Sequence, residues 1–148
     1  MIVVLSVLSA IAVPRYFDYR ERAAASAIAG QFKLIRSTMI RFRNDTGAWP
    51  PDGSGAGEVP TVARGYFSET NFNTNGRSPI GGTWDWNYFG GEQADICIHA
   101  VGTPSASAVA IMTRVDEMLD DGNLATGIFR WEAGIWGGSY RFYVVTPP

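Results

Sequence analysis

The hydrophobic pattern of this chain changes at Pro14. Before it stands an unbroken apolar run, MIVVLSVLSAIAV. Such a run places apolar side chains on every side of a helix, whereas a surface helix keeps them on one side. The run has 13 residues, and a bilayer-spanning helix needs about 20. We therefore expect either a short buried anchor or the end of a longer apolar helix. A cleaved secretory signal is disfavoured because no basic residue precedes the run.

After Pro14 the apolar positions recur every three or four residues. They form one stripe: Ala24, Ile28, Phe32, Ile35, Met39 and Phe42. The basic residues Arg22, Lys33, Arg36 and Arg43 lie largely off this stripe. The spacing predicts an amphipathic helix that ends near Asn44–Gly47, with Gly47 as a left-handed cap. A proline inside a helix removes one hydrogen bond, so we also expect a kink near residues 10–14.

The rest of the chain predicts short strands around one further helix. Residues 47–82 are rich in turn signals, with a helical turn near 61–65. Alternating patterns then predict strands at 83–89, 94–100, 127–132 and 139–145. Pro104 predicts a helix start with Thr103 as its cap, and Asp120–Asn123 ends that helix.

These elements predict an α+β fold. A long N-terminal helix, kinked near a proline, packs on a small antiparallel sheet of about four strands with one short extra helix. We expect an apolar helix at 1–14, its amphipathic continuation at 15–46, and a globular head at 47–148 that packs on residues 24–46. At 148 residues the chain has room for one modest core.

The N-terminal segment resembles a known family. The stretch V-V-L-S-V-L-S-A-I-A-V-P-R-Y, residues 3–16, leads through Pro14 to the aromatic residues Tyr16, Phe17 and Tyr19 and the alanine-rich stretch 23–29. This pattern is similar to the N-terminal helix of type IV pilins and type II secretion pseudopilins. The resemblance covers about the first 45 residues.

Some features of that family are absent from this sequence. These are a basic leader, a processing motif of Gly-Phe-Thr-Leu type and a glutamate just after it. We expect the DNA upstream of Met1 to encode them, with the glutamate about four residues before Met1. Many pilins also close a C-terminal loop with a disulfide, whereas this chain has one cysteine, Cys97, as in pseudopilins that lack the bridge.

The resemblance implies a structural role. The chain would be a non-enzymatic subunit of a type IV pilus-like or type II secretion filament, a homo-oligomer with related pilin-like subunits and without a cofactor. It would wait in the bacterial inner membrane facing the periplasm, then enter a periplasmic or extracellular filament. The residues implied in the membrane and the filament core are Ile2, Val3, Val4, Leu5, Val7, Leu8, Ile11, Val13 and Pro14. The alternative is a membrane-tethered module that binds a glycan or a protein through an aromatic head surface.

Charge is divided unevenly along the chain. Residues 1–43 hold seven of the 12 basic and two of the 14 acidic residues, so this half carries +5 and the remainder −7. A basic stalk and an acidic head favour attraction between neighbouring copies, although a solvated basic helix face would look the same. An acidic head disfavours nucleic acid as a partner.

Three groups of residues are candidates for chemistry. Trp84 and Trp86 share one side of a strand and, with Trp131 and Trp136, could stack on a sugar, although core packing is the simpler interpretation. Asp120, Asp121 and Asn123, near Asp116, offer oxygen ligands of the kind calcium takes. They do not match an EF-hand loop, and we expect exposed acids at a helix end that bind no calcium.

The third group is Cys97 with His99. In the alternating run 94–99 these two share one face of a strand, while Ile96 and Ile98 share the other. Two ligands are too few for a structural zinc site, so we expect a half-buried thiol beside a surface imidazole and no metal. Known catalytic motifs are missing from the sequence.

Overall fold

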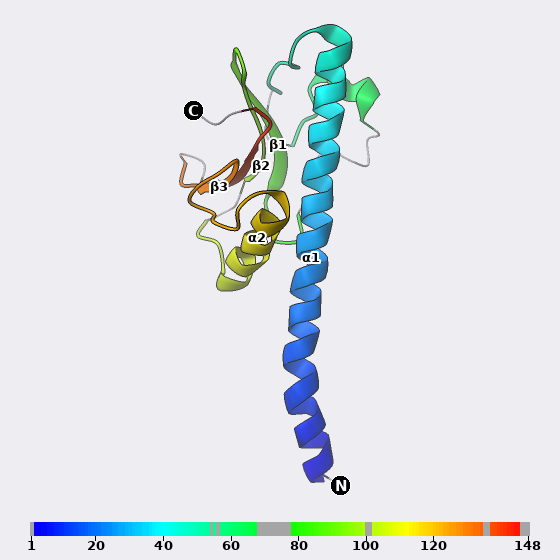
Figure 1. Cartoon of the computed structure of the whole chain (residues 1–148), viewed down its shortest axis with the longest axis vertical. Helices are drawn as coiled ribbons and strands as arrows, with labels where there is room; N and C mark the ends of the chain where they lie inside the picture. The colour runs from blue at the N-terminus through cyan, green and yellow to red at the C-terminus, as the bar shows by residue number, and fades with distance from the viewer. Residues whose placement is uncertain are drawn as a thin grey trace.

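The protein is a long helix with a small head attached to its C-terminal half (Figure 1). This computed structural model describes residues 2–53, 55, 57–67, 78–99, 102–134 and 137–145, with side chains from Ala12 onward. Along the chain, α1 is followed by the short 3₁₀-helix η1, strands β1 and β2, helix α2, and strands β3 and β4. The predicted α+β fold is confirmed.

Helix α1 spans Ile2–Thr46, 45 residues, and contains Pro14. The helix continues on both sides of the proline, so Pro14 does not divide it into two elements, and the kink stays a prediction. The helix ends where the sequence predicts. Gly47 has a φ of 79°, and its N–H donates to the carbonyl of Arg43 at 2.7 Å, which satisfies one of the last free carbonyls of the helix.

The sheet has four antiparallel strands in the order β1-β2-β4-β3. Their bounds are Thr83–Gly90 for β1, Gln93–His99 for β2, Phe129–Glu132 for β3 and Ser139–Tyr143 for β4. Strands β3 and β4 are each two residues shorter than the predicted 127–132 and 139–145. All four strands are therefore found, and only their ends move.

The core lies between α1 and one face of this sheet. The stripe predicted on the helix is buried there, with Phe32 at its centre. The Phe32 ring meets Trp84 at 4.7 Å, Phe129 at 5.2 Å and Phe142 at 5.7 Å, centroid to centroid and edge to face. Such aromatic pairs add stability beyond the area they bury. Other stripe residues in the same core are Ile28, Ile35, Met39 and Phe42.

Two short helices complete the head. Helix α2, Ala106–Leu119, adds Ile111, Met112 and Val115 to the core. Its N-cap is Ser105, whose hydroxyl accepts from the Ala108 N–H at 3.1 Å, so the predicted cap at Thr103 is wrong. Pro104 lies before the cap rather than in the first turn. The predicted helical turn near 61–65 is confirmed as η1, Thr61–Tyr66.

Candidate assembly surface and polar clusters of the head

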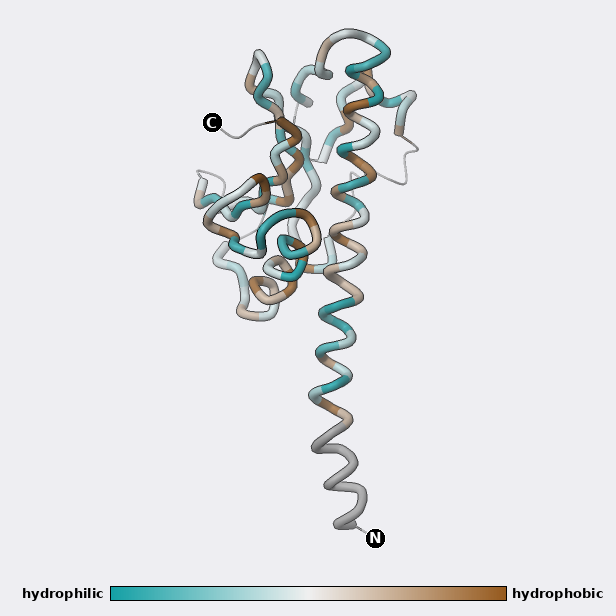
Figure 2. The backbone as a smooth tube through the Cα atoms, in the orientation of Figure 1, coloured by the Kyte–Doolittle hydropathy of each residue, from teal (hydrophilic) through white to brown (hydrophobic). Residues whose placement is uncertain are grey.

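The N-terminal half of α1 extends beyond the head as a stalk (Figure 1). On its described part, four large apolar side chains face outward: Val13 is 51% exposed, Tyr16 60%, Phe17 55% and Tyr19 70%. In Figure 2 the part of α1 below the head shows short brown and tan segments between teal ones. A run of exposed apolar side chains on one element marks a surface that takes a partner.

The head begins to contact α1 at Asp18, within the last turn of this surface. Asp18 accepts from Arg114 of α2 at 2.6 Å and pairs with Arg22 at 2.9 Å on its own helix. Ser107, also on α2, donates to Glu21 at 3.0 Å. These polar contacts separate the docked half of α1 from the stalk.

The residues implied in the membrane and the filament core fall into two groups. Ile2, Val3, Val4, Leu5, Val7, Leu8 and Ile11 have side chains outside the described part of the structure. Val13 and Pro14 are exposed on the stalk. Within the described residues, no helix combines the length and the apolar character needed to span a bilayer.

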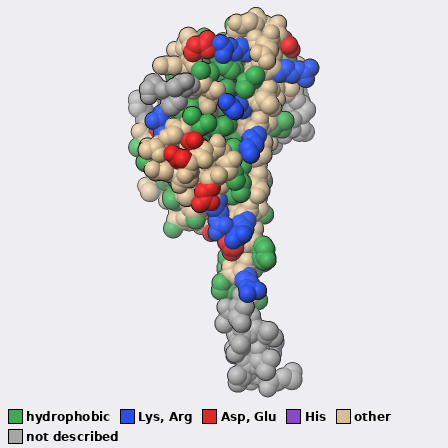
Figure 3. Space-filling view, viewed as in Figure 1, with side chains coloured by type: hydrophobic (Ala, Val, Ile, Leu, Met, Phe, Trp, Pro, Cys, Tyr) green, Lys and Arg blue, Asp and Glu red, His purple; other side chains and the backbone are tan. Residues whose placement is uncertain are grey.

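Basic side chains recur along α1, and Figure 3 shows several of them in blue down its side. Three of them, Arg36, Arg41 and Arg43, lie over aromatic rings of the head. The guanidinium of Arg43 lies 4.6 Å from the Trp49 ring centre and pairs with Glu92 at 2.7 Å. That of Arg36 lies 5.5 Å from the ring of Phe142. Arg36 and Arg43 are half-buried, whereas the neighbouring stripe residues Ile35, Met39 and Phe42 are buried.

Trp84 and Trp86 do share one side of β1, but that side faces the core. Trp84 stacks edge to face on Phe32. Trp86 is fully buried, and its indole N–H donates to the carbonyl of Pro50 at 3.1 Å. Neither ring has a free face for a sugar. Trp131 packs on Tyr140, with ring centres 4.7 Å apart, and Trp136 lies outside the described residues.

The acids after α2 organise the turn that leads to β3. Asp120 accepts from the N–H groups of Ile128 and Phe129. Asp121 accepts from the N–H of Asn123 at 2.8 Å and from the hydroxyl of Thr126 at 3.0 Å. The expected picture of acids that are simply exposed is therefore incomplete, because both carboxylates hold a loop in place.

Asp116 joins two of the calcium candidates. Its carboxylate and those of Asp120 and Asp121 lie within 4.8 Å of one another, whereas the Asn123 side chain accepts from the Ala125 N–H at 3.2 Å. Asp116 is fully buried, and the backbone N–H groups of Gly122 and Asp121 lie close enough to its carboxylate to oppose a rise of its pKa. Burial, and then the charges of Asp121 and Asp120, raise the pKa of Asp116 to about 6.

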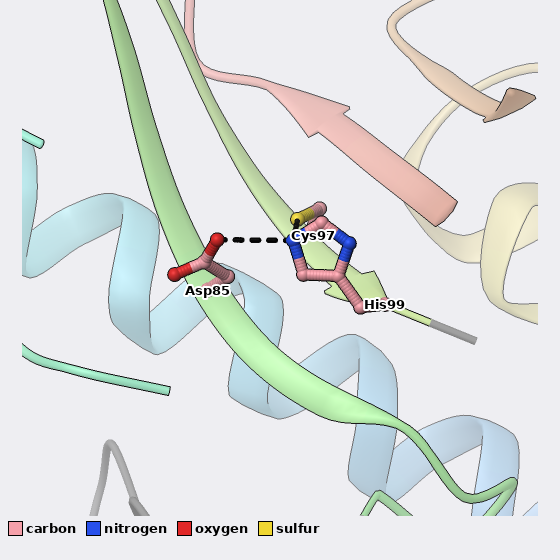
Figure 4. A group of neighbouring side chains, drawn as sticks. All are labelled: Asp85, Cys97 and His99. Carbon is pink, nitrogen blue, oxygen red and sulfur yellow. Dashed lines mark hydrogen bonds and ion pairs between the residues drawn. The ribbon is translucent and has the colours of Figure 1, made fainter. Parts of the chain in front are cut away.

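Cys97 and His99 lie on the outer face of the sheet with a third residue, Asp85 (Figure 4). His99 Nε2 is 3.0 Å from Asp85 Oδ2 and 3.5 Å from Cys97 Sγ. Cys97 is fully buried and the His99 side chain is only 17% exposed. The expectation of a half-buried thiol beside a surface imidazole is thus wrong. The sequence did not point to Asp85, because it joins the pair only through strand pairing.

This polar network continues along the outer face. Asp95 accepts from Arg141 at 2.6 Å and from Asn87 at 2.8 Å. Burial raises the pKa of the Asp95 carboxyl, although Arg141 opposes the shift. Burial, and then the negative charges of Asp95 and Asp85, raise the pKa of the Cys97 thiol well above its usual range. A higher pKa leaves less of the thiolate, which is the reactive form of a cysteine.

Comparison with known proteins agrees with this architecture. The structure is similar to that of the major type IV pilin PilA1 from Clostridium difficile, with a TM-score of 0.60 over 86% of this chain and 98% of that one, at 12% sequence identity. In sequence, the chain is similar to the fimbrial protein EcpC of Eikenella corrodens, with 28% identity over 80 residues. That match spans 54% of this chain and about half, 52%, of the relative. No family model matches the sequence.

The fold is therefore that of a type IV pilin: a long N-terminal helix packed on a four-stranded antiparallel sheet with a short extra helix. The resemblance inferred from the N-terminal segment is confirmed by the structural neighbour and by the fimbrial relative.

Proposed function

We propose that the chain is a structural subunit of a type IV pilus-like filament that assembles through its N-terminal helix. The observation that carries this proposal is the stalk: Val13, Tyr16, Phe17 and Tyr19 are exposed on a helix whose next turns are docked on a head of pilin fold. Exposing these side chains to water is unfavourable by about 25 cal/mol per Å² of apolar surface. Packing against the stalks of neighbouring copies removes that cost.

The proposal extends to location and partners. Before assembly the apolar run would rest in the inner membrane with the head in the periplasm. It would then exchange lipid contacts for contacts with copies of itself and with related subunits. Because lipid tails are as apolar as the run, the gain on assembly comes from helix packing rather than from dehydration. The fimbrial relative favours a surface pilus over a type II secretion pseudopilus.

A non-enzymatic role is part of the same proposal. Ser139, His99 and Asp85 are hydrogen-bonded in series, at 3.0 Å each, an order that resembles a hydrolase triad. However, Ser139 is only 3% exposed, so a substrate carbonyl would not reach its hydroxyl. The binding-module alternative loses its main support, because Trp84 and Trp86 lie in the core.

Self-association of the purified 148-residue chain tests the proposal. The chain is kept in mild detergent, the detergent is removed, and sedimentation velocity and negative-stain microscopy follow assembly. We expect large or filamentous species from the unchanged chain and smaller ones from Tyr16→Ser and Phe17→Ser. Val62→Ser is the matched control, since Val62 is 57% exposed but lies on η1.

Two results would contradict the proposal. One is an unchanged chain that remains monomeric after detergent removal. The other is a Val62→Ser variant that loses assembly as fully as the stalk variants, because the association would then be unspecific.

A further inference from the structure

The outer face of the sheet carries a group of side chains with the chemistry of a metal site. Asp85 on β1 pairs directly with Cys97 on β2, and His99 follows two residues later on the same face of β2. Side chains directly opposite in an antiparallel pair lie about 5 Å apart at Cβ. Strand register thus gathers a carboxylate, a thiol and an imidazole at one place, and Figure 4 shows the three converging.

The spacing of their ligand atoms fits a tetrahedral ion. Zinc bonds are about 2.3 Å to sulfur and about 2.0 Å to nitrogen or oxygen, so tetrahedral angles separate S and N by about 3.5 Å and N and O by about 3.3 Å. Here Cys97 Sγ and His99 Nε2 are 3.5 Å apart, and His99 Nε2 and Asp85 Oδ2 are 3.0 Å apart. Small side-chain movements would bring all three within bonding distance of one ion.

The neighbouring side chains are placed as supporting residues of a metal site are. Ser139 Oγ lies 3.0 Å from His99 Nδ1. The hydroxyl oxygen can therefore accept a hydrogen bond from Nδ1–H, which leaves the lone pair of Nε2 free for the ion. Asn87 Nδ2 donates to Cys97 Sγ at 3.2 Å, a contact that stabilises a thiolate. The imidazole and the thiol are thus each oriented by a second residue.

The charge of the cluster favours a cation. Asp95 is balanced by Arg141 at 2.6 Å. Asp85 is buried, and within the described part of the chain it forms an ion pair with the imidazole of His99. A second acid, Asp52, lies in a nearby loop. Its pKa is raised mainly by burial and secondly by the negative charge of Asp85. A bound dication would neutralise this excess of negative charge.

We propose that Asp85, Cys97 and His99 bind one zinc-type divalent ion. A thiolate, an imidazole and a carboxylate together suit zinc, whereas calcium and magnesium take oxygen ligands. Binding exchanges the Cys97 S–H bond for an S–Zn bond and releases that proton to solvent. The fourth position is left to water or to a group from outside the chain. The ion would tie β1 to β2 independently of the assembly function.

Metal titration of the full 148-residue chain, purified without a polyhistidine tag and held in mild detergent, tests this site. Zinc is added in competition with a chromophoric chelator. We expect about one zinc per chain and a rise in melting temperature, since an ion that binds only the folded state stabilises it. Cys97→Ser, His99→Gln and Asp85→Asn should each weaken binding at least about tenfold. Glu92→Gln, a carboxylate change in the turn of the same hairpin, should leave it unchanged.

Replacing zinc with cobalt identifies the coordinating atoms from the absorption spectrum. A tetrahedral cobalt site with a thiolate gives a sulfur-to-metal charge-transfer band, which should appear in the unchanged chain and vanish in Cys97→Ser. This readout holds even where a variant folds poorly, because the unchanged chain alone reveals sulfur ligation. The proposal is overturned if the chain binds no zinc, if Cys97→Ser binds it as tightly, or if the cobalt spectrum lacks the thiolate band.

Discussion

The two halves of α1 are both rich in apolar residues, yet they meet different surroundings. In the C-terminal half, Phe32 is fully buried among aromatic rings of the sheet. In the N-terminal half, Tyr16 and Tyr19 are 60% and 70% exposed. Both belong to one continuous helix. Apolar residues in the C-terminal half therefore stabilise the monomer, whereas the exposed ones in the N-terminal half lie outside its core and are available to another chain.

The sharpest test of this contrast is Phe32→Ala. Removing a ring that touches Trp84, Phe129 and Phe142 leaves a cavity at the centre of the core, and we expect the free energy of unfolding to fall by about 3–5 kcal/mol. Denaturant unfolding followed by tryptophan fluorescence measures it. The control is Lys33→Ala, because Lys33 follows Phe32 on α1 but is exposed. This variant should change the free energy of unfolding only slightly. Equal small effects at both positions would mean that α1 does not depend on this contact with the sheet.

A change confined to the head should alter stability without altering assembly. Asp116 is buried with a pKa raised to about 6, so its charged form is less favourable in the folded chain than in the unfolded one. The penalty is absent below about pH 4, grows through the folded pKa and is complete above it. Asp116→Asn should therefore stabilise the head by on the order of 1–3 kcal/mol at pH 7 and by little near pH 4.

The matched control for this change is Glu117→Gln, the next residue on α2 and exposed. Melting temperatures of the three chains between pH 4 and 7.5, in buffer with a metal chelator, give the comparison. A difference between Asp116→Asn and the unchanged chain that stays constant across this range would show that Asp116 does not titrate as described.

How far the sequence predicted this molecule depends on the kind of contact. Spacings of three and four along α1 predicted the buried stripe because the helix period is local information. Alternation predicted that Cys97 and His99 share a face for the same reason. Alternation also predicted that Trp84 and Trp86 share one face of a strand. It could not predict which face of the sheet the helix would cover, so it could not decide whether the two rings lie in the core or on a ligand-binding surface.

What the sequence could not provide is register between strands. Asp85 becomes the partner of Cys97 only because β1 and β2 pair with those two residues opposite each other. Gly82 adds to this register: with a φ of +81° it approaches the backbone of His99 so closely that a Cβ would lie 2.1 Å from its carbonyl oxygen. The cap of α2 was also misplaced: Pro104 was expected inside the helix, whereas the helix begins after Ser105.

The boundary between the two halves of α1 gives a smaller effect. Asp18 pairs with Arg114 across the helix–helix junction and with Arg22 along its own helix. Both pairs are partly exposed, so each is worth about 0.2–1 kcal/mol. In double-mutant cycles with Asp18→Asn, we expect a larger coupling for Arg114→Ala than for Arg22→Ala, because Arg114 joins two elements. If the coupling is equal for the two arginines, or larger for Arg22, then the contact between α1 and the head begins C-terminal to Asp18.

The smallest effect on the monomer is expected at Tyr19, which has the most exposed large apolar side chain of the described stalk. Because its ring is 70% exposed, Tyr19→Ser should change the free energy of unfolding by less than about 0.5 kcal/mol. Denaturant unfolding in detergent measures this, with Phe32→Ala as the opposite extreme on the same helix. A loss above 1 kcal/mol would mean that the stalk supports the head, and the division of α1 would fail. If stability is unchanged while sedimentation shows weaker association, then the tyrosine ring acts between chains and not within one.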